Sequence, residues 1–364
     1  MIRMNDFQSE PEELRAQMLH ASKRVIDSGW YVLGKELKKF EEQWAKVCGV
    51  KHAVGVGNGM DAIEIALRSL GVGEGDEVIT TPMTAFATVL AIYRTGAVPV
   101  LADIDPETAL LSIESVERCI SEKTKVVLLV HLYGQVRNMK AWGELCERRN
   151  LYLIEDCAQA HLAKSDNQVA GTFGHAGAYS FYPTKNLGAL GDAGMLITNN
   201  KTAYKKANCI RNYGQSERYH HPELGLNSRL DELQASILLE RIKWLEGFTK
   251  RRQEIAHAYR SGLDNARISM LAEPESPDSH VYHLFVICCE EREALMEHMA
   301  LQQVQTLIHY PLVIHEQKPC KTIKRDPNGL VHSEQHSKVC LSLPCHPQMS
   351  SGDITSVINA VNTF

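Results

Sequence analysis

The sequence predicts an α/β fold in which a mostly parallel central sheet is flanked by helices and followed by a smaller α+β domain. Two observations predict it. Between about residues 50 and 200, short runs rich in β-branched residues alternate with helical patterns, as expected for repeated strand–helix–strand units. Near-continuous apolar runs such as Val126–Val130 suit strands that are covered on both faces, which is typical of parallel sheets.

The individual elements follow from these patterns. The expected strands are His52–Val56, Glu77–Thr80, Val98–Asp103, Lys125–His131, Leu151–Glu155, Ala178–Phe181 and Gly194–Thr198. Helical patterns lie between them, and the one after the first strand places its apolar residues at i, i+3, i+4 and i+7. These residues are Ile63, Ala66, Leu67 and Leu70.

A long helix is expected next, because one apolar stripe continues for several turns. The stripe contains Leu230, Leu233, Ile237, Leu238, Ile242 and Leu245. Asp231 and Glu232 in the first turn complement the positive end of the helix dipole. Beyond about residue 248, a basic helical segment leads to a loop at 273–277 and a strand at His280–Cys289. We therefore expect a large cofactor-binding α/β domain with an N-terminal helical segment over residues 1–245 and a small α+β domain over residues 246–364.

Composition and charge exclude several classes of protein. The 364 residues are 44% hydrophobic and carry a formal net charge of −5, so the chain can bury a sizeable core. The acidic balance, with no long basic run, argues against a nucleic acid polymer or an anionic membrane as partner. No apolar run approaches the roughly 20 residues of a membrane-spanning helix. The N-terminus lacks the apolar core of a secretory signal, and we expect a cytoplasmic protein.

The cysteines and histidines do not predict a metal site. The ten cysteines are scattered and form no Cys-x-x-Cys pair, so reduced and mostly buried thiols are expected. The histidine pairs His280/His283 and His332/His336 have workable spacings for a metal ion, but no cysteine or carboxylate cluster lies beside them in the sequence. We therefore expect solvated or core histidines and no metal.

The turn at Gly55–Ala62, between a strand and a helix, is a candidate anion site. Its glycines let the backbone approach a ligand, and the free amides at a helix start favour an anion. The turn departs from the dinucleotide fingerprint, because Met60 replaces the third glycine and no ribose-binding acid ends a second strand about 20 residues later. A phosphate site and a plain tight turn remain the alternatives.

Three further segments carry an acid, a lysine and a polar helix start. Asp156 follows an apolar run and is expected at the carboxyl end of a parallel strand, where open α/β sheets bind ligands; a helix N-cap is the alternative. Lys185 follows another strand and precedes the glycine-rich stretch 188–194. Such a lysine is either a surface charge or a neutral amine that forms a Schiff base. The last segment, 225–230, begins the long helix.

One ligand would use all of these features. Pyridoxal phosphate needs a lysine for its aldehyde, an acid that keeps its ring nitrogen protonated, and donors for its phosphate. Each segment falls at the end of an expected strand or at the start of an expected helix. The spacing is therefore compatible with a single pyridoxal phosphate site.

The segments also resemble those of the sugar-nucleotide aminotransferases, the DegT/DnrJ/EryC1/StrS family. The resemblance runs from about residue 25 to the C-terminus in the family's order and rests on Asn58–Ala62, Glu155–His161, Ser180–Asn186, Gly191–Gly194, Gly225–Ala235 and His309–Pro311. It implies a fold-type-I homodimer that depends on pyridoxal 5'-phosphate. It also implies a transaminase of the EC 2.6.1 class that moves an amino group from L-glutamate to a keto-deoxysugar nucleotide, in amino-sugar biosynthesis for a surface polysaccharide or a glycosylated metabolite.

The resemblance implies roles for individual residues. Lys185 would be the Schiff-base lysine and proton shuttle, and Asp156 would be the partner of the ring nitrogen. The remaining implied cofactor contacts are Gln159 at the ring hydroxyl, Gly59, Met60 and Ser180 at the phosphate, and Asn227 at the phosphate bound in the neighbouring subunit. The implied sugar-site residues are His309, Tyr310 and His315, and Arg229 is a candidate for the diphosphate.

One position departs from the family pattern. Members often carry an aromatic residue after the first threonine of a Thr-aromatic-x-Ala-Thr run, where it stacks on the cofactor ring. In Thr84–Thr88 this position is Ala85, and Phe86 follows one place later. Either Phe86 stacks from a shifted backbone, which we favour, or a smaller residue covers the ring.

The sequence leaves alternatives for the acceptor sugar and for the type of activity. The turn 58–62 and the segment 29–34 look most like members that act on 3-keto-6-deoxyhexoses linked to dTDP, while amination at carbon 4 and a UDP-linked sugar stay open. Because Lys185 is present, transamination is expected rather than the dehydration carried out by relatives without this lysine. A cofactor-bound sensor without catalysis is the alternative of another class. A nicotinamide-dependent dehydrogenase is disfavoured by Met60.

Overall fold

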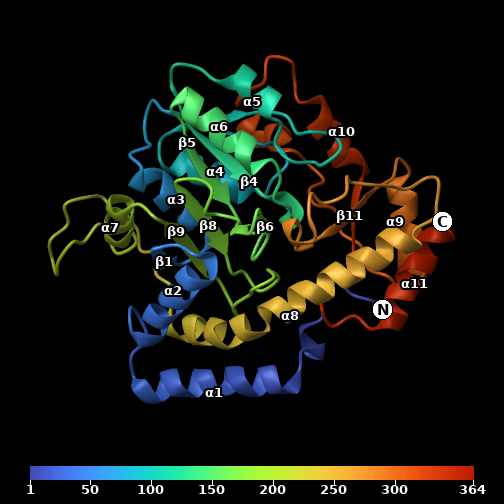
Figure 1. The fold of residues 1–364 in the computed structure, drawn as a ribbon, viewed down its shortest axis with the longest axis horizontal. Helices are drawn as coiled ribbons and strands as arrows, with labels where there is room; N and C mark the ends of the chain where they lie inside the picture. The colour runs from blue at the N-terminus through green and yellow to red at the C-terminus, as the bar shows by residue number, and fades with distance from the viewer.

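The computed structural model describes the whole chain, residues 1–364. An eight-stranded sheet forms the centre of the larger part of the molecule, with helices on both of its faces (Figure 1). The helices are α1 (Glu12–Ser28), α2 (Lys35–Cys48), α3 (Gly59–Ser69), α4 (Phe86–Arg94), α5 (Ile113–Cys119), α6 (Met139–Arg149), α7 (Lys201–Ile210), α8 (Glu232–Gly262), α9 (Arg292–Leu301), α10 (Val331–Val339) and α11 (Ser351–Asn362). The strands are β1 (His52–Val56), β2 (Glu77–Thr80), β3 (Val98–Leu101), β4 (Thr124–Val130), β5 (Tyr152–Asp156), β6 (Lys164–Ser165), β7 (Gln168–Val169), β8 (Ala176–Ser180), β9 (Gly194–Thr198), β10 (Ser269–Met270), β11 (Phe285–Cys288), β12 (Lys324–Arg325) and β13 (Cys340–Leu343).

The central sheet is mostly parallel, as the sequence predicts. Its strand order is β1-β9-β8-β5-β4-β2-β3-β12, and only β9 runs antiparallel to its neighbours, β1 and β8. The carboxyl ends of β1, β5 and β8 therefore lie at the same edge of the sheet. Because the Gly55–Ala62 turn, Asp156 and the Lys185 segment follow these strands, the topology brings them to one edge.

Side chains of the central strands alternate between two cores. Val127 and Leu129 of β4 belong to a core that also contains residues of α2, α6 and α8. Val126 and Leu128 belong to a second core, with residues of α3, α4 and α7. Both faces of the sheet are thus covered, which is why the strand sequences are apolar almost without interruption.

The start of α8 is joined to the start of α2 by one carboxylate. Glu232 accepts hydrogen bonds from the backbone N–H groups of Gly34 at 2.9 Å, Glu36 at 2.8 Å and Leu37 at 2.9 Å. Gly34, the N-cap of α2, has no side chain that could do this. Glu232 therefore satisfies the free amides of α2, in addition to the expected interaction with the dipole of its own helix.

A smaller part of the molecule follows the middle of α8. Its three-stranded antiparallel sheet, β10-β11-β13, packs with α9, α11 and the last turns of α8 around a separate core. The expected strand at His280–Cys289 is shorter, because only Phe285–Cys288 pairs as β11. Helix α8 is 31 residues long and runs unbroken from beneath the large sheet to this part (Figure 1). The expected boundary at residue 245 falls inside this helix, and the division into two domains stays a prediction.

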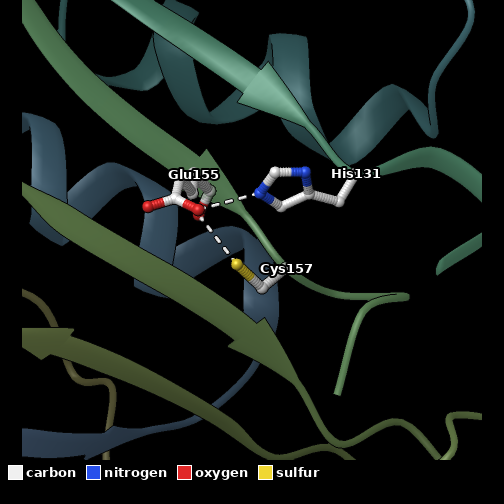
Figure 2. Close-up of side chains that lie close together, drawn as sticks. All are labelled: His131, Glu155 and Cys157. Carbon is white, nitrogen blue, oxygen red and sulfur yellow. Dashed lines mark hydrogen bonds and ion pairs between the residues drawn. The ribbon is translucent and has the colours of Figure 1, made fainter. Parts of the chain in front are cut away.

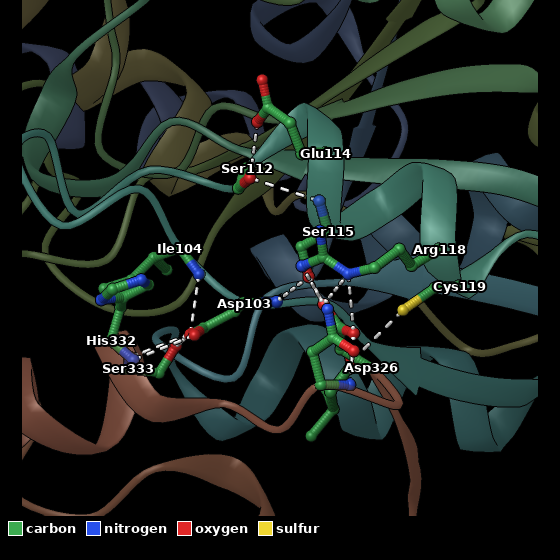
Figure 3. A network of polar contacts seen from close by, with 12 residues as sticks. Asp103, Ile104, Ser112, Glu114, Ser115, Arg118, Cys119, Asp326, His332 and Ser333 are labelled. Carbon is green, nitrogen blue, oxygen red and sulfur yellow. Dashed lines mark hydrogen bonds and ion pairs between the residues drawn. The ribbon is translucent and has the colours of Figure 1, made fainter.

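The C-terminal part of the chain also returns to the large sheet. Strand β12 pairs with β3 at the edge of the sheet, and α10 begins against the end of β3. There the buried carboxylate of Asp103 accepts hydrogen bonds from the backbone N–H groups of His332 and Ser333, both at 2.9 Å, and from the Ser333 hydroxyl (Figure 3). Beside β12, Asp326 accepts a hydrogen bond from Ser115 and pairs with Arg118. Asp103 thus fastens α10, and Asp326 fastens the segment before α10, to the larger part.

All ten cysteines are free, and seven of them are buried, in agreement with the expected reduced thiols. No helix has both the length and the apolar character that crossing a bilayer requires.

Candidate active site

Asp156 ends β5 in a buried, fixed position. One carboxylate oxygen accepts the backbone N–H of Ala158 at 3.1 Å, and the other accepts the hydroxyl of Thr88 on α4 at 2.9 Å. Burial raises the pKa of Asp156, while these hydrogen bonds and the positive charge of Lys185 act to lower it. The carboxylate does not cap a helix, because turns rather than a helix follow β5.

Lys185 lies in the loop after β8, where its backbone N–H bonds to the carbonyl of Tyr182 at 2.8 Å. Burial lowers the pKa of its amine to about 8, and attraction to Asp156 opposes this shift. A large fraction of the amine is therefore neutral at mildly basic pH, which a nucleophilic or proton-accepting lysine requires.

Side-chain hydrogen bonds stabilise the turn between β1 and α3. Asn58 caps α3 by accepting the N–H of Asp61 at 2.8 Å. The hydroxyl of Ser228 accepts the N–H of Gly57 at 2.9 Å and donates to Asp61 at 2.7 Å. The backbone donors of the helix start are thereby held in place for a ligand.

Gly59, Met60 and Ser180 meet at this helix start. A Cβ on Gly59 would lie 2.6 Å from the Cβ of Ser180, so only glycine fits there. None of the backbone hydrogen bonds outside regular elements uses the N–H groups of Gly59 and Met60. Free amides at a helix N-terminus beside a serine hydroxyl suit a phosphate. Together with Lys185 and Asp156, these residues fit pyridoxal phosphate.

Gln159, Tyr310 and His309 continue the same site. Gln159 accepts the backbone N–H of Tyr133 at 2.6 Å and donates its own amide N–H to the Tyr310 hydroxyl at 3.3 Å. Burial, together with the negative charge of Asp156, raises the pKa of Tyr310 to about 12. Burial and the charge of Lys185 lower the pKa of His309 to about 4. Both rings are therefore uncharged at neutral pH.

Two buried histidines lie close enough to Lys185 to sense its charge. His161 packs against Trp44, Tyr179 and Phe181, its ring nitrogens have no partner, and burial lowers its pKa to about 3. Burial also lowers the pKa of His283 well below its usual range, and its Nδ1 bonds to Asn186 at 3.1 Å. Lys185 is therefore surrounded by uncharged rings, with Asp156 as its counter-charge.

Asn227 is exposed and Arg229, two residues later, is half-buried. The Arg229 guanidinium donates to the side chain of Asn227 and stacks over the ring of Tyr213, 5.0 Å from its centroid. It also donates to Asn212 at 3.2 Å. These contacts are with neighbours before α8 rather than with Lys185 or Asp156, so the implied roles of Asn227 and Arg229 stay predictions.

The placement of His315 and Phe86 differs from that of the residues around Lys185. His315 bonds through Nε2 to Glu334 of α10 at 3.0 Å. Phe86 is 37% exposed and lies two positions before Thr88, which is about 200° around α4. Ala85, three positions before Thr88, lies on the face that carries Thr88. The geometry thus favours the alternative that a small residue, Ala85, covers the ring, and the assignments of Phe86 and His315 stay predictions.

A buried group of His131, Glu155 and Cys157 lies beside the site (Figure 2). Glu155 already accepts the backbone N–H groups of Gly171, Phe173 and Gly174, at 2.7 to 2.8 Å, and a contact from His131 at 2.9 Å. Its oxygens are therefore occupied by hydrogen bonds. The group holds the 171–174 turn against β5, the strand that ends at Asp156.

Sequence reasoning missed three residues of this site. In the sequence, Thr88 appears only as part of the Thr84–Thr88 run, Tyr133 carries no motif of its own, and His283 is a candidate only for a metal site. Tyr133 lies just past the end of an expected strand, Lys125–His131. The rule that drew attention to Asp156, a polar side chain at the carboxyl end of a parallel strand, also applies to it.

The fold and the arrangement of Lys185 and Asp156 at one sheet edge define an aminotransferase of fold type I. Residues 12–362 match the DegT/DnrJ/EryC1/StrS aminotransferase family. The chain belongs to this family, and the predicted family, fold class and enzyme class are confirmed.

Two relatives align over the whole chain. The dTDP-3-amino-3,6-dideoxy-alpha-D-galactopyranose transaminase of Aneurinibacillus thermoaerophilus is 41% identical, over 100% of this chain and 99% of the relative. The "Pleiotropic regulatory protein" of Geobacillus stearothermophilus is 39% identical, over 100% of this chain and 98% of the relative.

Solved structures agree with the fold. DesV of S. venezuelae, solved in complex with a ketimine intermediate, has a TM-score of 0.95 at 38% identity and covers 100% of this chain and 97% of its own. NtdA of Bacillus subtilis, solved with bound cofactor PMP, has a TM-score of 0.88 at 30% identity and covers 97% of this chain and 82% of its own. The family and these neighbours imply pyridoxal phosphate as the cofactor.

Proposed function

We propose that this aminotransferase uses pyridoxal 5'-phosphate to move an amino group from L-glutamate to a 3-keto-6-deoxyhexose linked to dTDP. The observation that carries the proposal is the meeting of Lys185, Asp156 and the Gly59–Met60–Ser180 donors at one sheet edge. The relative at 41% identity, which is named as a transaminase of a dTDP-linked 3-amino sugar, supports this acceptor. The product would serve amino-sugar biosynthesis.

The residues of the site have separate tasks in this reaction. Bound here, pyridoxal phosphate would supply the group that receives the amino group and a protonated ring that withdraws electrons from the substrate carbon. Lys185, whose amine has a pKa of about 8, accepts and returns a proton at Nζ. Asp156, held by Thr88 and Ala158, presents a fixed negative charge that keeps the ring nitrogen protonated.

The surrounding residues bind the cofactor and orient the substrate. The N–H groups of Gly59 and Met60 and the Ser180 hydroxyl bind the phosphate. The Gln159 amide and the Tyr310 hydroxyl present hydrogen-bond donors beside Asp156. His309 and Tyr310 border the sugar, and both stay uncharged at neutral pH, so neither adds a charge to those of Lys185 and Asp156.

We also infer a homodimer in which each subunit completes the other's site. Several large apolar or aromatic side chains are exposed in the single chain: Trp30 at 62%, Leu190 at 58%, Tyr219 at 79% and Leu224 at 87%. In the dimer that we infer, the partner subunit covers these side chains. Asn227 is exposed as well and would serve the phosphate in the neighbouring subunit. The enzyme is expected in the cytoplasm, where nucleotide sugars are made.

A complementation experiment tests the shared site. Lys185→Ala and Asn227→Asp, each weakly active alone, are mixed in equal amounts, dissociated and reassociated. Half of the dimers then contain one intact site, so activity recovers to about a quarter of the wild-type value. No recovery, in a mixture shown by mass to contain hybrid dimers, contradicts the shared site.

Spectroscopy and a substrate panel test the reaction itself. The purified protein should absorb as a lysine-bound pyridoxal phosphate enzyme, and L-glutamate should convert this spectrum to that of the pyridoxamine form. Keto sugars with the ketone at carbon 3 or 4, linked to dTDP or UDP, are then compared as acceptors. The proposal is supported if the dTDP-linked 3-keto sugar restores the original spectrum faster than the other sugars do. If another sugar of the panel is faster, the proposed acceptor is wrong.

A sensor that binds the cofactor without catalysis is the second candidate, because the relative at 39% identity is named a pleiotropic regulatory protein. The same spectra separate the two. A lysine-bound cofactor spectrum that L-glutamate leaves unchanged, together with no turnover of any acceptor, favours the sensor.

A further inference from the structure

Tyr133, just beyond the end of β4, contacts both Gln159 and the His309–Tyr310 segment of the site. Its side chain is 1% exposed. Its backbone N–H donates to the Gln159 side chain at 2.6 Å, and its hydroxyl donates to the backbone carbonyl of His309 at 2.7 Å. The hydroxyl also meets Nε2 of His336, on α10, at 2.9 Å. The backbone at Tyr133 has φ 64°, the left-handed conformation that ordinary residues adopt only where the surroundings hold it.

The hydrogen bonds around the Tyr133 hydroxyl have a defined direction. A carbonyl oxygen only accepts, so the single hydroxyl proton is committed to His309. The His336 contact must then be an N–H donated from Nε2 to the phenol oxygen. Burial lowers the pKa of His336 to about 4, so the ring is neutral and its Nδ1 carries no proton. Nδ1 faces the thiol of Cys288 at 3.9 Å, which can donate to it.

The backbone of Tyr133 likewise orients Gln159. The Gln159 oxygen must face the Tyr133 N–H, because only the oxygen accepts a hydrogen bond. The NH₂ group is therefore turned toward Tyr310 and the interior of the site. The hydroxyl of Tyr133 fixes the peptide that joins His309 to Tyr310, and its N–H fixes the side chain that Tyr310 contacts.

We propose that Tyr133 is a positioning residue for the sugar half of the reaction, which holds the His309–Tyr310 segment against Gln159 with His336 as its support. The proposal rests on the proposed function, in which His309 and Tyr310 border the sugar. Helix α10 reaches the His309–Tyr310 segment through this contact chain, from His336 to Tyr133 to His309.

Tyr133→Phe tests the proposal, because it removes the hydroxyl and keeps the N–H to Gln159. The two half-reactions are followed separately by absorbance. Conversion of the cofactor by L-glutamate should stay within about twofold of wild type, while amination of the keto-sugar nucleotide should slow about tenfold, as expected for the loss of a buried hydrogen bond that orients the reacting groups. The KM for the sugar nucleotide should rise with it.

Tyr259→Phe is the matched control. Tyr259 is also fully buried, and its hydroxyl also donates to a backbone carbonyl at 2.7 Å, that of Pro344. The two variants should lose similar thermal stability, but Tyr259→Phe should leave both half-reactions unchanged. An equal slowing of the sugar half-reaction in both variants, or an unchanged rate in Tyr133→Phe, overturns the proposal.

His336 provides a readout that does not depend on turnover. Nitrogen-15 NMR of the cofactor-free protein should show His336 as the neutral tautomer with the proton on Nε2, and a proton on Nδ1 instead overturns the inferred chain. His336→Gln, which retains an N–H donor, should rescue the sugar half-reaction relative to His336→Leu. If wild-type enzyme turns over no sugar nucleotide at all, the proposed function fails. The positioning role is then decided by whether a crystal structure of Tyr133→Phe shows Tyr310 displaced from Gln159.

Discussion

At the scale of single residues, Lys185 and Asp156 oppose each other's titration. Burial disfavours the charged form of both, lowering the pKa of the amine and raising that of the carboxyl, while the attraction between them favours both charges. The balance leaves the lysine amine with a pKa of about 8. Lys185 can thus change its proton within the working range of an enzyme, which an exposed lysine cannot.

The first prediction concerns the pH dependence of Lys185. In cofactor-free protein, acetylation of Lys185, measured by mass spectrometry, should rise with pH and reach half of its limiting rate near the pKa of about 8. In Asp156→Asn the attraction that raises the lysine pKa is lost, so the midpoint should move to lower pH. Acetylation of the exposed Lys140 serves as internal reference. A midpoint that does not move, or moves upward, contradicts the proposed pairing.

The second prediction concerns Thr88. Thr88→Val keeps the volume but removes the hydroxyl that donates to Asp156, so the pKa of Asp156 should rise further and its charge should be less available to the ring nitrogen. The affinity for pyridoxal phosphate, measured by absorbance titration, should fall roughly fivefold to tenfold. Thr198→Val, which removes a buried hydroxyl that donates to the His175 carbonyl, is the control and should bind the cofactor normally.

At the scale of elements, the position of α10 depends on Asp103. This carboxylate accepts the first free N–H groups of α10 and the Ser333 hydroxyl (Figure 3), and a buried negative charge at a helix N-terminus is held by the helix dipole as well. Because α10 carries His336, the docking of this helix bears on the His309–Tyr310 segment of the site.

The third prediction is that Asp103→Asn destabilises the protein by about 2–4 kcal/mol, since it replaces a buried, fully bonded carboxylate with a group that cannot accept all of the same hydrogen bonds. Thermal or denaturant unfolding measures the loss. Asp353→Asn, which alters the exposed capping box of α11, should cost about 1 kcal/mol or less. Equal losses of stability in the two variants would contradict the prediction, because Asp103 would then stabilise its helix no more than an exposed helix cap does.

The elements that the sequence predicts well are those with a strong local pattern. The expected bounds of His52–Val56, Glu77–Thr80 and Gly194–Thr198 match β1, β2 and β9, because apolar runs between turn residues mark buried strands. The two-residue β12 could not be predicted, since its pairing with β3 depends on contacts between segments more than 200 residues apart. The same holds for Glu232, whose bonds to α2 cross 195 or more residues.

The residues of the site likewise fall into those that a local motif predicts and those that depend on tertiary packing. Lys185, Asp156 and Gly59 lie in short motifs whose chemistry is legible in the sequence alone. The roles of Tyr133 and Thr88 come from the tertiary packing of β4, β5 and α4, and the direction of Phe86 depends on where α4 begins. A one-residue difference in a helix start turns a side chain by about 100°, which is enough to decide whether an aromatic ring points toward a binding site or away from it.

At the scale of the whole molecule, burial of uncharged histidines makes the fold sensitive to acid. Burial is the largest cause of the lowered pKa in His161, His283, His309 and His336, with values of about 3 for His161 and about 4 for His309 and His336. In the unfolded chain histidine titrates at about 6.5. Between these values the unfolded chain binds more protons than the folded one, so acid favours unfolding.

The fourth prediction follows from this difference. Stability should be steady between about pH 6.5 and the pKa of about 8 at which Lys185 titrates. It should fall as the pH drops from about 6.5 toward about 4, by up to about 1.4 kcal/mol per pH unit for each histidine that protonates only on unfolding. Denaturant unfolding at a series of pH values measures the slope. His161→Phe, in a fully buried aromatic cluster, should make the slope shallower by about one proton. A slope unchanged by this substitution contradicts the account.

The central claim, that Lys185 holds the cofactor for amino transfer, is tested most directly by borohydride reduction followed by peptide mass spectrometry. Borohydride should fix pyridoxal phosphate to the protein at Lys185 and at no other lysine, and prior incubation with L-glutamate should abolish this label. Lys185→Ala should carry no label. Attachment at a different lysine, or a label on Lys185 that survives incubation with L-glutamate, would contradict the claim.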